Sequence, residues 1–349
     1  MDRRLLVLAL GMFALGTDSF VVAGVLPEIT HGFEVGIGAA GQMTTIYAVT
    51  YAVLAPVIAA LAAHVGRKGL LLSGLGVFVV ANLGTAIAPT FGIALVTRAL
   101  AGLGAAVFSP TATGAAASIV PPERRGFALS VVIAGMTVST ALGAPIGTLI
   151  GGLADWRWTM VFVAVLAAAS GLGVMAFLSH IPMLPAVRLR QRLAPLADAS
   201  IGLTLATTFL FFGAAFTIYT YFAVVFDRAI GNDPALLSAL LVVWGFAGTV
   251  SNLLTGRLID SVGNRKVLIA YLFLVFADFV LLPWTSASIW TAIPAVLLWG
   301  ACGWEYSFLS SIASSVSRRR LLPSFSASTT PRRSSARPLP ESSAPLAST

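Results

Sequence analysis

The sequence predicts an all-α protein that crosses a membrane many times. Hydrophobic residues make up 58% of the chain and charged residues only 10%, a balance that excludes an ordinary soluble domain. The mean hydropathy is +0.93, and long apolar runs alternate with short charged segments. Since a helix needs about 20 apolar residues to cross about 30 Å of hydrocarbon, a chain of 349 residues has room for about ten spans.

The first apolar run, residues 5–26, follows a positively charged start, as a signal peptide does. It is too long for one and lacks a small-x-small cleavage site, so we expect a retained first helix. The other apolar runs predict further spans at 40–63, 69–88, 91–118, 127–152, 158–179, 200–226, 235–256, 267–284 and 287–312.

Charge bias predicts the orientation of these spans. The loops with many basic residues alternate with loops that carry only Arg157 or Arg228. The basic set comprises Arg3, Arg4, Arg67, Lys68, Arg124, Arg125, Arg188, Arg190, Arg192, Arg257, Arg265 and Lys266. The positive-inside rule then puts the N-terminus of this multi-pass protein in the cytoplasm. The net charge of +8 is thus a topology signal and implies no nucleic-acid partner.

A charged, glycine-punctuated segment at residues 256–266 has a weaker copy in the first half of the chain. The segment contains Gly256, Asp260, Gly263, Arg265 and Lys266, and the copy ends in Gly66, Arg67 and Lys68. The spacing between Gly66 and Gly263 also separates Leu5 from Gly202, where another apolar run begins. Such an internal repeat predicts two pseudo-symmetric helical bundles. We expect a six-helix bundle at 1–180, a cytoplasmic linker at 181–199 and a bundle of about four helices at 200–316.

Residues 317–349 are almost entirely Ser, Pro, Arg and Ala. We expect them to be disordered, since this composition can neither span a bilayer nor pack a core. Two explanations are open. One is a cytoplasmic tail on a ten-span protein. The other, which we favour, is a twelve-span protein truncated after about ten helices and read out of frame, leaving the second bundle incomplete.

The sequence offers no cofactor site. One cysteine, Cys302, excludes an internal disulfide or a cysteine metal centre. His31, His64 and His180 fall at or near predicted span ends, which disfavours a buried zinc site. No Gly-x-x-x-x-Gly-Lys-Ser/Thr loop exists, which disfavours an ATP-driven pump. The expected energy source is the proton gradient, and no enzymatic activity is expected.

Two charges inside predicted spans are the main functional candidates, because ionisable groups are costly in a membrane. Asp18 should lie about 13 Å below the outer, non-cytoplasmic end of the span 5–26, and Arg98 about 10 Å below the outer end of the span 91–118. These depths allow an ion pair. A carboxylate that exchanges a proton for its arginine partner would couple transport to protons. The alternatives are a static ion pair, or Asp18 in hydrogen bonds with Thr17 and Ser19.

Two more acids fall in predicted spans. For Asp278 we favour a structural, hydrogen-bonded contact between helices over a role in transport, and Glu305 is assigned no role.

Small residues recur at intervals of four in the span 127–152. They include Gly135, Gly143 and Gly147, with Pro145 beside them. A stripe of this kind lets a second backbone approach closely. Tight packing explains part of it, and an interface poor in side chains can also slide or rock, with a bend at the proline.

These segments resemble the major facilitator superfamily. Residues 256–266 resemble its glycine/aspartate/arginine signature between helices 2 and 3 and between helices 8 and 9, and residues 98–106 resemble its helix-4 motif. Residues 135–147 resemble the helix-5 motif of its antiporter branch. Residues 17–27 and 156–158 are similar to bacterial drug:proton and sugar-efflux antiporters, a group that includes chloramphenicol exporters. The resemblance covers about residues 5–304.

The resemblance implies two six-helix bundles around a central cavity with alternating access. It implies that Asp18 and Arg98 take part in proton coupling. It further implies that Arg67, Lys68, Asp260 and Arg265 hold the cytoplasmic side closed.

Aromatic residues are the candidates for substrate contacts. Tyr47 and Tyr51 lie one turn apart in the span 40–63, and Tyr219, Phe222 and Trp244 lie in the two spans after the linker. They could stack flat lipophilic compounds or serve as core residues and interface anchors.

The sequence and its resemblance to this family therefore predict a proton-coupled efflux antiporter of the bacterial inner membrane, for small lipophilic compounds such as chloramphenicol-like drugs. The expected partners are the lipid bilayer, protons and a small-molecule substrate, and we expect a monomer. Sugar or metabolite efflux and a non-transporting truncated remnant are the alternatives.

Overall fold

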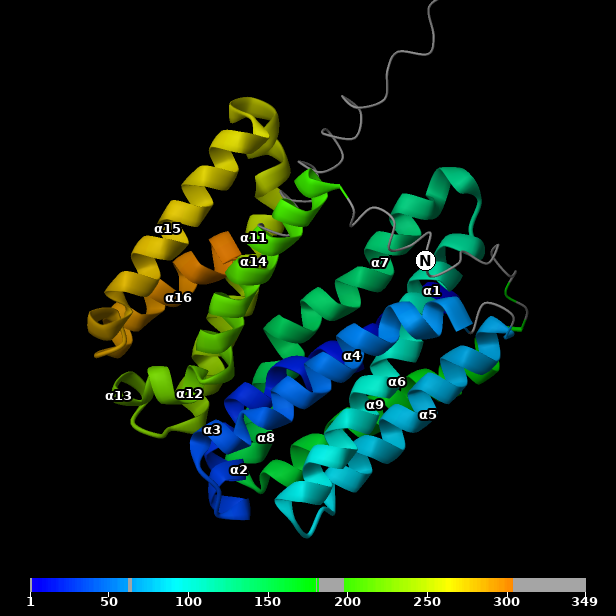
Figure 1. The fold of residues 1–349 in the computed structure, drawn as a ribbon, viewed down its shortest axis with the longest axis horizontal. Helices are drawn as coiled ribbons and strands as arrows, with labels where there is room; N and C mark the ends of the chain where they lie inside the picture. The colour runs from blue at the N-terminus through cyan, green and yellow to red at the C-terminus, as the bar shows by residue number, and fades with distance from the viewer. Residues whose placement is uncertain (1, 62–64, 180, 182–197, 304–349) are drawn as a thin grey trace, which may run out of the picture.

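The computed structural model describes residues 2–61, 65–179, 181 and 198–303. These residues form helices and short connections, with no strand among them. Figure 1 shows two groups of helices side by side. We call them the N-terminal and the C-terminal group.

The N-terminal group begins with α1 (Arg3–Val21), which a 3₁₀ turn at Val22–Gly24 extends. Its other helices are α2 (Leu26–Phe33), α3 (Ile37–Ala40), α4 (Gln42–Leu61), α5 (Arg67–Ala86), α6 (Phe91–Ser118), α7 (Arg125–Val138), α8 (Ala144–Leu153) and α9 (Trp156–Phe177). The helices of the C-terminal group are α11 (Ala199–Thr220), α12 (Phe222–Val225), α13 (Asp227–Ile230), α14 (Pro234–Val262), α15 (Asn264–Thr285) and α16 (Ile289–Gly303).

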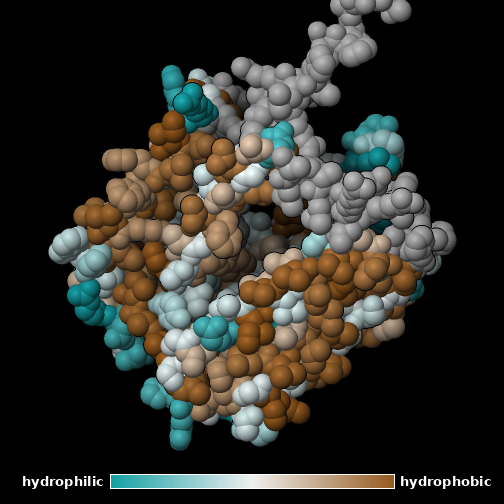
Figure 2. Space-filling model, in the orientation of Figure 1, coloured by the Kyte–Doolittle hydropathy of each residue, from teal (hydrophilic) through white to brown (hydrophobic). Residues whose placement is uncertain are grey.

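Among the described residues, nine helical stretches are long and apolar enough to cross a membrane. They correspond to the first nine predicted spans. The tenth is represented by α16, a shorter apolar helix, and the rest of that prediction, with Glu305, lies outside the described residues. Figure 2 shows hydrophobic side chains over most of the visible face, as expected for a surface in contact with lipid.

The charged segment 256–266 is mostly helical, whereas the sequence predicted a loop. α14 continues to Val262 and α15 begins at Asn264. Residues 257–262 contain neither Gly nor Pro to end the helix. The turn is concentrated at Gly263, whose φ of +91° suits a residue without a Cβ.

The predicted span 127–152 is one helix interrupted by a π-helical turn at Ser139–Gly143, between α7 and α8. The amide of Ala144 donates to the Ser139 carbonyl, five residues back. Pro145 follows and has no N–H to offer to the previous turn. The missing donor explains why the regular hydrogen-bond ladder shifts here.

Helix contacts differ between the groups. In the N-terminal group α6 packs against α4 and α5, and α1 packs against α7 and α9. In the C-terminal group α14 and α15 both pack against α16. The groups meet where α14 contacts α8 and the π-helical turn. We call the end of the molecule that carries α2, α3, α12 and α13 the α2 end (Figure 1).

Candidate proton-coupling and substrate site

Asp18 on α1 and Arg98 on α6 form a buried ion pair. An Nη1 atom of Arg98 donates to Oδ1 of Asp18 at 2.6 Å. The side chain of Asp18 is 0% exposed and that of Arg98 is 1% exposed. The structure therefore brings together the two charges that the sequence singled out, one from each helix.

The ion pair is only partly satisfied by hydrogen bonds. Oδ2 of Asp18 and Nε of Arg98 are buried and have no partner. The neighbouring hydroxyls do not serve them, since Thr17 donates to the Phe13 carbonyl and Ser19 donates to the Leu15 carbonyl. The alternative in which Thr17 and Ser19 bind the Asp18 carboxylate is thus not what the structure has. An unpartnered buried carboxylate oxygen is costly and is an available position for a proton.

Tyr47 covers the guanidinium of Arg98. The guanidinium carbon lies 4.8 Å from the centroid of the Tyr47 ring, and the hydroxyl oxygens of Tyr47 and Ser19 lie 3.2 Å apart. Tyr47 is 3% exposed, so in this conformation it touches the ion pair rather than open space. Tyr51, one turn on, donates to Ser109 at 2.9 Å.

The small-residue stripe of α7 and α8 faces α1 in a constant register. A Cβ on Gly135 would overlap the carbonyl of Ala9, and one on Gly143 would overlap the Thr17 hydroxyl. Side chains added at Gly147 and Gly151 would meet Val21 and Val25. Pro145 is buried in the same segment. The stripe therefore holds the turn of α1 that carries Asp18 against the π-helical turn.

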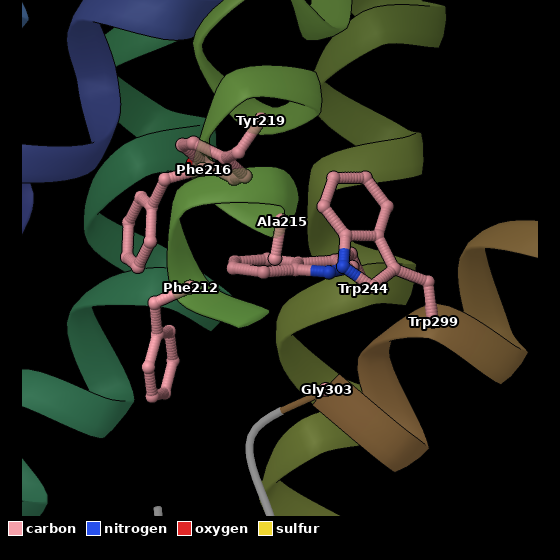
Figure 3. Close-up of a pocket in the computed structure, with 7 residues that line it drawn as sticks. All are labelled: Phe212, Ala215, Phe216, Tyr219, Trp244, Trp299 and Gly303. Carbon is pink, nitrogen blue, oxygen red and sulfur yellow. The ribbon is translucent and has the colours of Figure 1, made fainter. Parts of the chain in front are cut away.

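A second feature is an aromatic cluster in the C-terminal group (Figure 3). We use this name for Phe212, Phe216 and Tyr219 of α11, Trp244 of α14 and Trp299 of α16. The rings of Tyr219 and Trp244 lie 4.7 Å apart, and those of Trp244 and Trp299 lie 5.6 Å apart. The space they enclose is about 20 Å³, so a ligand can enter only if rings move apart. Phe222 packs beside it on Trp299.

The aromatic cluster touches α1 next to the ion pair. Phe20, two residues after Asp18, lies 5.4 Å from the Tyr219 ring and 6.2 Å from the Trp244 ring. The hydroxyl of Tyr219 donates to the backbone carbonyl of Phe20 at 3.1 Å. Sequence reasoning found Tyr219, Phe222 and Trp244 but missed Phe20, Phe212, Phe216 and Trp299.

Other contacts also hold the two groups together. Ser238 of α14 donates to the Pro145 carbonyl at 3.0 Å. Gly245 lies against the backbone of Ala141 so closely that an added Cβ would come within 2.6 Å of it. Close backbone packing of this kind favours a closed interface between α14 and the π-helical turn.

A cavity of about 180 Å³ lies between the groups at the α2 end. Pro27, Glu28 and His31 line it from α2, and Asn232 and Asp233 line it from the segment before α14. Oε2 of Glu28 is buried without a partner. Burial raises the pKa of the Glu28 carboxyl, against the opposing effects of a backbone hydrogen bond and of His31.

The structure describes only some of the side chains that were predicted to hold the cytoplasmic side closed. Gly66 precedes α5, Lys68 donates to the Met175 carbonyl at 2.9 Å, and Arg67 lies near Gly114. These contacts of Arg67 and Lys68 are within the N-terminal group. Arg265 and Lys266 are exposed, Gly256 lies within α14, and the side chain of Asp260 lies outside the described part of the chain.

Asp278 on α15 is 5% exposed, and its Oδ2 has no hydrogen-bond partner. The hydrogen-bonded contact expected from the sequence is therefore not made by this oxygen.

Within the residues that the structure describes, no group of three or more His, Cys, Asp or Glu side chains could hold a metal ion.

Comparisons with known proteins agree with this architecture. The family model of the Major Facilitator Superfamily matches residues 8–329. The chain is 31% identical over 303 residues to the inner membrane transport protein YdhP of Escherichia coli (strain K12), covering 85% of this chain and 76% of that protein. It is 31% identical over 308 residues to the chloramphenicol resistance protein of Streptomyces lividans, with the same coverage of 85% and 76%.

Among solved structures, the fold is similar to that of a bacterial homolog of the human lysosomal transporter Spinster. The TM-score is 0.66 at 19% identity, covering 91% of this chain and 78% of that one. The protein is a multi-pass membrane protein, and the chain belongs to the Major Facilitator Superfamily of membrane transporters.

Proposed function

We propose that the protein is a proton-coupled exporter of small lipophilic compounds that works by alternating access. The observation that carries this proposal is the fully buried Asp18–Arg98 pair with its unpartnered carboxylate oxygen. A proton arriving at Oδ2 of Asp18 neutralises the carboxylate and weakens its hold on Arg98. Loss of the proton restores the pair, so that protonation can alternate with a conformational change.

The contacts between the groups suggest which conformation the structure represents. The α2 end is held closed by Ser238 on Pro145 and by the close approach of Gly245 to Ala141. We place the cytoplasm at the opposite end, where the N-terminus lies, in line with the charge bias of the loops. In this arrangement the α2 end faces the outside and opens to release substrate in the other half of the cycle.

The aromatic cluster supports lipophilic substrates. Among the described residues, its lining has five aromatic side chains and no charged one, and the Tyr219 hydroxyl already donates to the Phe20 carbonyl. Sugars need several polar partners, which this lining does not offer. Flat apolar rings stack well between such side chains. The chloramphenicol resistance protein among the relatives supports the same substrate class.

Everted membrane vesicles from cells that produce the chain test the proposal. We expect them to accumulate chloramphenicol when a proton gradient is imposed and to lose it when a protonophore is added. Vesicles without the chain provide the baseline. Uptake that survives the protonophore would contradict proton coupling, and uptake of lactose instead of chloramphenicol would contradict the substrate class. Absence of flux for both compounds would contradict transport by this chain.

Replacing Trp299 by alanine should weaken substrate binding. A lost stacking partner costs about 0.5–1.5 kcal/mol beyond area burial, which predicts a KM for chloramphenicol higher by about tenfold with little change in the maximal rate. Trp290→Ala is the matched control on the same helix, because Trp290 is 81% exposed and is not among the residues that line the cluster. Equal KM values for the two variants would remove the cluster from the substrate path.

Glu28 should make closure of the α2 end depend on pH. Its pKa is raised in the closed arrangement, so protonation stabilises closure. This contribution is fully present below the carboxyl's ordinary value of 4.5 and is lost as pH rises through the raised pKa. His31 and Asp233 face the same cavity, and Asp233 is held by the amides of Ala235 and Leu236.

Spin labels on Gly38→Cys and Ala235→Cys, one on each group near the α2 end, can report this closure. With native Glu28 the labels should move apart as pH rises through that window. In Glu28→Gln, which resembles the protonated acid, the separation should stay constant. A pH-dependent separation in Glu28→Gln would show that another group is responsible.

A further inference from the structure

Tyr219 is the side chain that touches both parts of the proposed machinery. Its ring lines the aromatic cluster. Its hydroxyl crosses from α11 to α1 and donates to the carbonyl of Phe20 at 3.1 Å. The residue is 3% exposed, so water does not compete for this bond in the conformation described.

The backbone carbonyl of Phe20, which accepts this hydrogen bond, lies near the C-terminal end of α1. Phe20 is in the last turn of α1, which ends at Val21 and passes into a 3₁₀ turn. Carbonyls in the last turn of an α-helix lack their usual partners four residues on. Asp18 is half a turn earlier on the same helix, and Gly143 packs against the side chain of Thr17, the residue before Asp18.

We propose that Tyr219 is a positioning residue that links occupancy of the aromatic cluster to the Asp18–Arg98 pair through its hydrogen bond to Phe20. This inference rests on the proposed proton-coupled transport and adds the residue by which the two events depend on each other. A role in substrate contact alone would need the ring of Tyr219 and would not need its hydroxyl.

The crowding of the cluster provides the physical link. The space between the rings is about 20 Å³, far smaller than a drug molecule. A ligand that stacks between Trp244 and Tyr219 must therefore displace the Tyr219 ring, since the two rings lie only 4.7 Å apart. Displacing the ring pulls its hydroxyl away from Phe20 and releases α1 from α11. Substrate thereby favours the conformation in which the two groups separate, which is the differential binding that coupling requires.

Proteoliposomes that contain the purified chain allow coupling and binding to be measured separately. Exchange of labelled chloramphenicol at equal pH on both sides reports binding and movement without a proton gradient. Uptake driven by a pH gradient reports coupling. In Tyr219→Phe we expect the KM for exchange to stay within about twofold, since the ring remains, and gradient-driven uptake to fall by about fivefold or more.

Two further variants define the role of the hydroxyl. Tyr271→Phe is the matched control, because the Tyr271 hydroxyl pairs with Thr255 at 3.0 Å inside the C-terminal group, and it should change neither measurement. Phe20→Ala keeps the backbone acceptor but removes a ring next to the cluster. We expect it to raise KM and to retain the ratio of gradient-driven uptake to exchange. Loss of that ratio in Phe20→Ala would assign the effect to packing and overturn the role of the hydrogen bond.

The outcomes separate this inference from the function it rests on. If Tyr219→Phe keeps full gradient-driven uptake while Asp18→Asn has none, the role of Tyr219 is wrong and proton coupling stands. If Tyr219→Phe raises the KM for exchange by tenfold, the hydroxyl contacts substrate and the positioning role is wrong. If Asp18→Asn drives uptake normally, both proposals fail.

A readout without transport covers the case in which the variant is inactive. Chloramphenicol should change the separation of spin labels on Gly38→Cys and Ala235→Cys in the native background, and should not change it in Tyr219→Phe. An equal change in both backgrounds would overturn the inference.

Discussion

Replacing Asp18 by asparagine is expected to abolish gradient-driven uptake of chloramphenicol while leaving the chain inserted and folded. Asparagine is close in size to aspartate and can still accept a hydrogen bond from Arg98, but it has no proton to bind or release. Transport that needs a proton at this position stops completely. Exchange of chloramphenicol at equal pH, which needs no net proton movement, should continue. The measurement is the ratio of gradient-driven uptake to exchange in proteoliposomes.

Asp278→Asn is the matched control for this prediction. Asp278 is also a buried acid in a spanning helix and also has an unpartnered Oδ2, but it lies on α15 of the C-terminal group, away from the ion pair in the N-terminal group. Its substitution should leave gradient-driven uptake within about twofold of the native protein, since losing a buried carboxylate without a partner removes no bond. If Asp278→Asn abolished uptake and Asp18→Asn did not, the coupling site would have to be moved to α15.

The choice of asparagine rather than alanine follows from the burial of Arg98. Removing one partner of a buried ion pair leaves the other charge uncompensated, at a cost of about 3–5 kcal/mol. Asp18→Asn also leaves the Arg98 charge without a counterion, but it keeps a side chain of the same size and an oxygen that accepts from Arg98. Asp18→Ala removes these as well, so its inactivity would not separate a lost proton site from a lost fold. A monodisperse profile and a cooperative thermal unfolding transition for Asp18→Asn would show that the lost function is not a lost fold.

The ion pair could be predicted from the sequence because it depends on few quantities. Charges in apolar runs are rare, and a rise of 1.5 Å per residue fixes their depth. Asp18 and Arg98 were placed at similar depth in this way, and the structure has them 2.6 Å apart. The side chains that surround the ion pair could not be predicted from the depth of the two charges in the membrane. Tyr47 was a candidate for substrate contact, but the rotation of α4 puts its ring over Arg98.

The aromatic cluster and the π-helical turn show where prediction from sequence ends. The cluster draws its rings from α11, α14 and α16, and the relative rotation of three helices cannot be read from spacing when each helix is apolar on all sides. The turn at Ser139–Gly143 depends on a backbone hydrogen bond that shifts by one residue near Pro145. The proline indicated a bend, but the position of the bend and the contact of Ala141 with Gly245 come from packing against α14. The charged residues after Gly256 mark the end of the apolar span, but α14 extends to Val262 because residues 257–262 contain no helix breaker.

Replacing Gly135 by alanine is expected to destabilise the N-terminal group more than other single-methyl changes in α7. The added Cβ would overlap the carbonyl oxygen of Ala9, which belongs to the backbone of α1. A side chain can rotate out of the way, but a helix backbone cannot move without shifting the whole of α1. Overpacking of this kind costs about 1–3 kcal/mol. Since α1 carries Asp18, the shift should also disturb the ion pair and lower gradient-driven uptake.

Gly126→Ala is the matched control in the same helix, because a Cβ there would meet no atom within 4 Å. Alanine is the better helix former by up to about 1 kcal/mol, so Gly126→Ala should have a melting temperature in detergent equal to or above that of the native protein. Gly135→Ala should melt several degrees lower. Equal melting temperatures for the two variants would mean that α1 and α7 can separate freely. The small-residue stripe would then not be what fixes Asp18 against the π-helical turn, and the close register of Gly135, Gly143 and Gly147 along α1 would need another explanation.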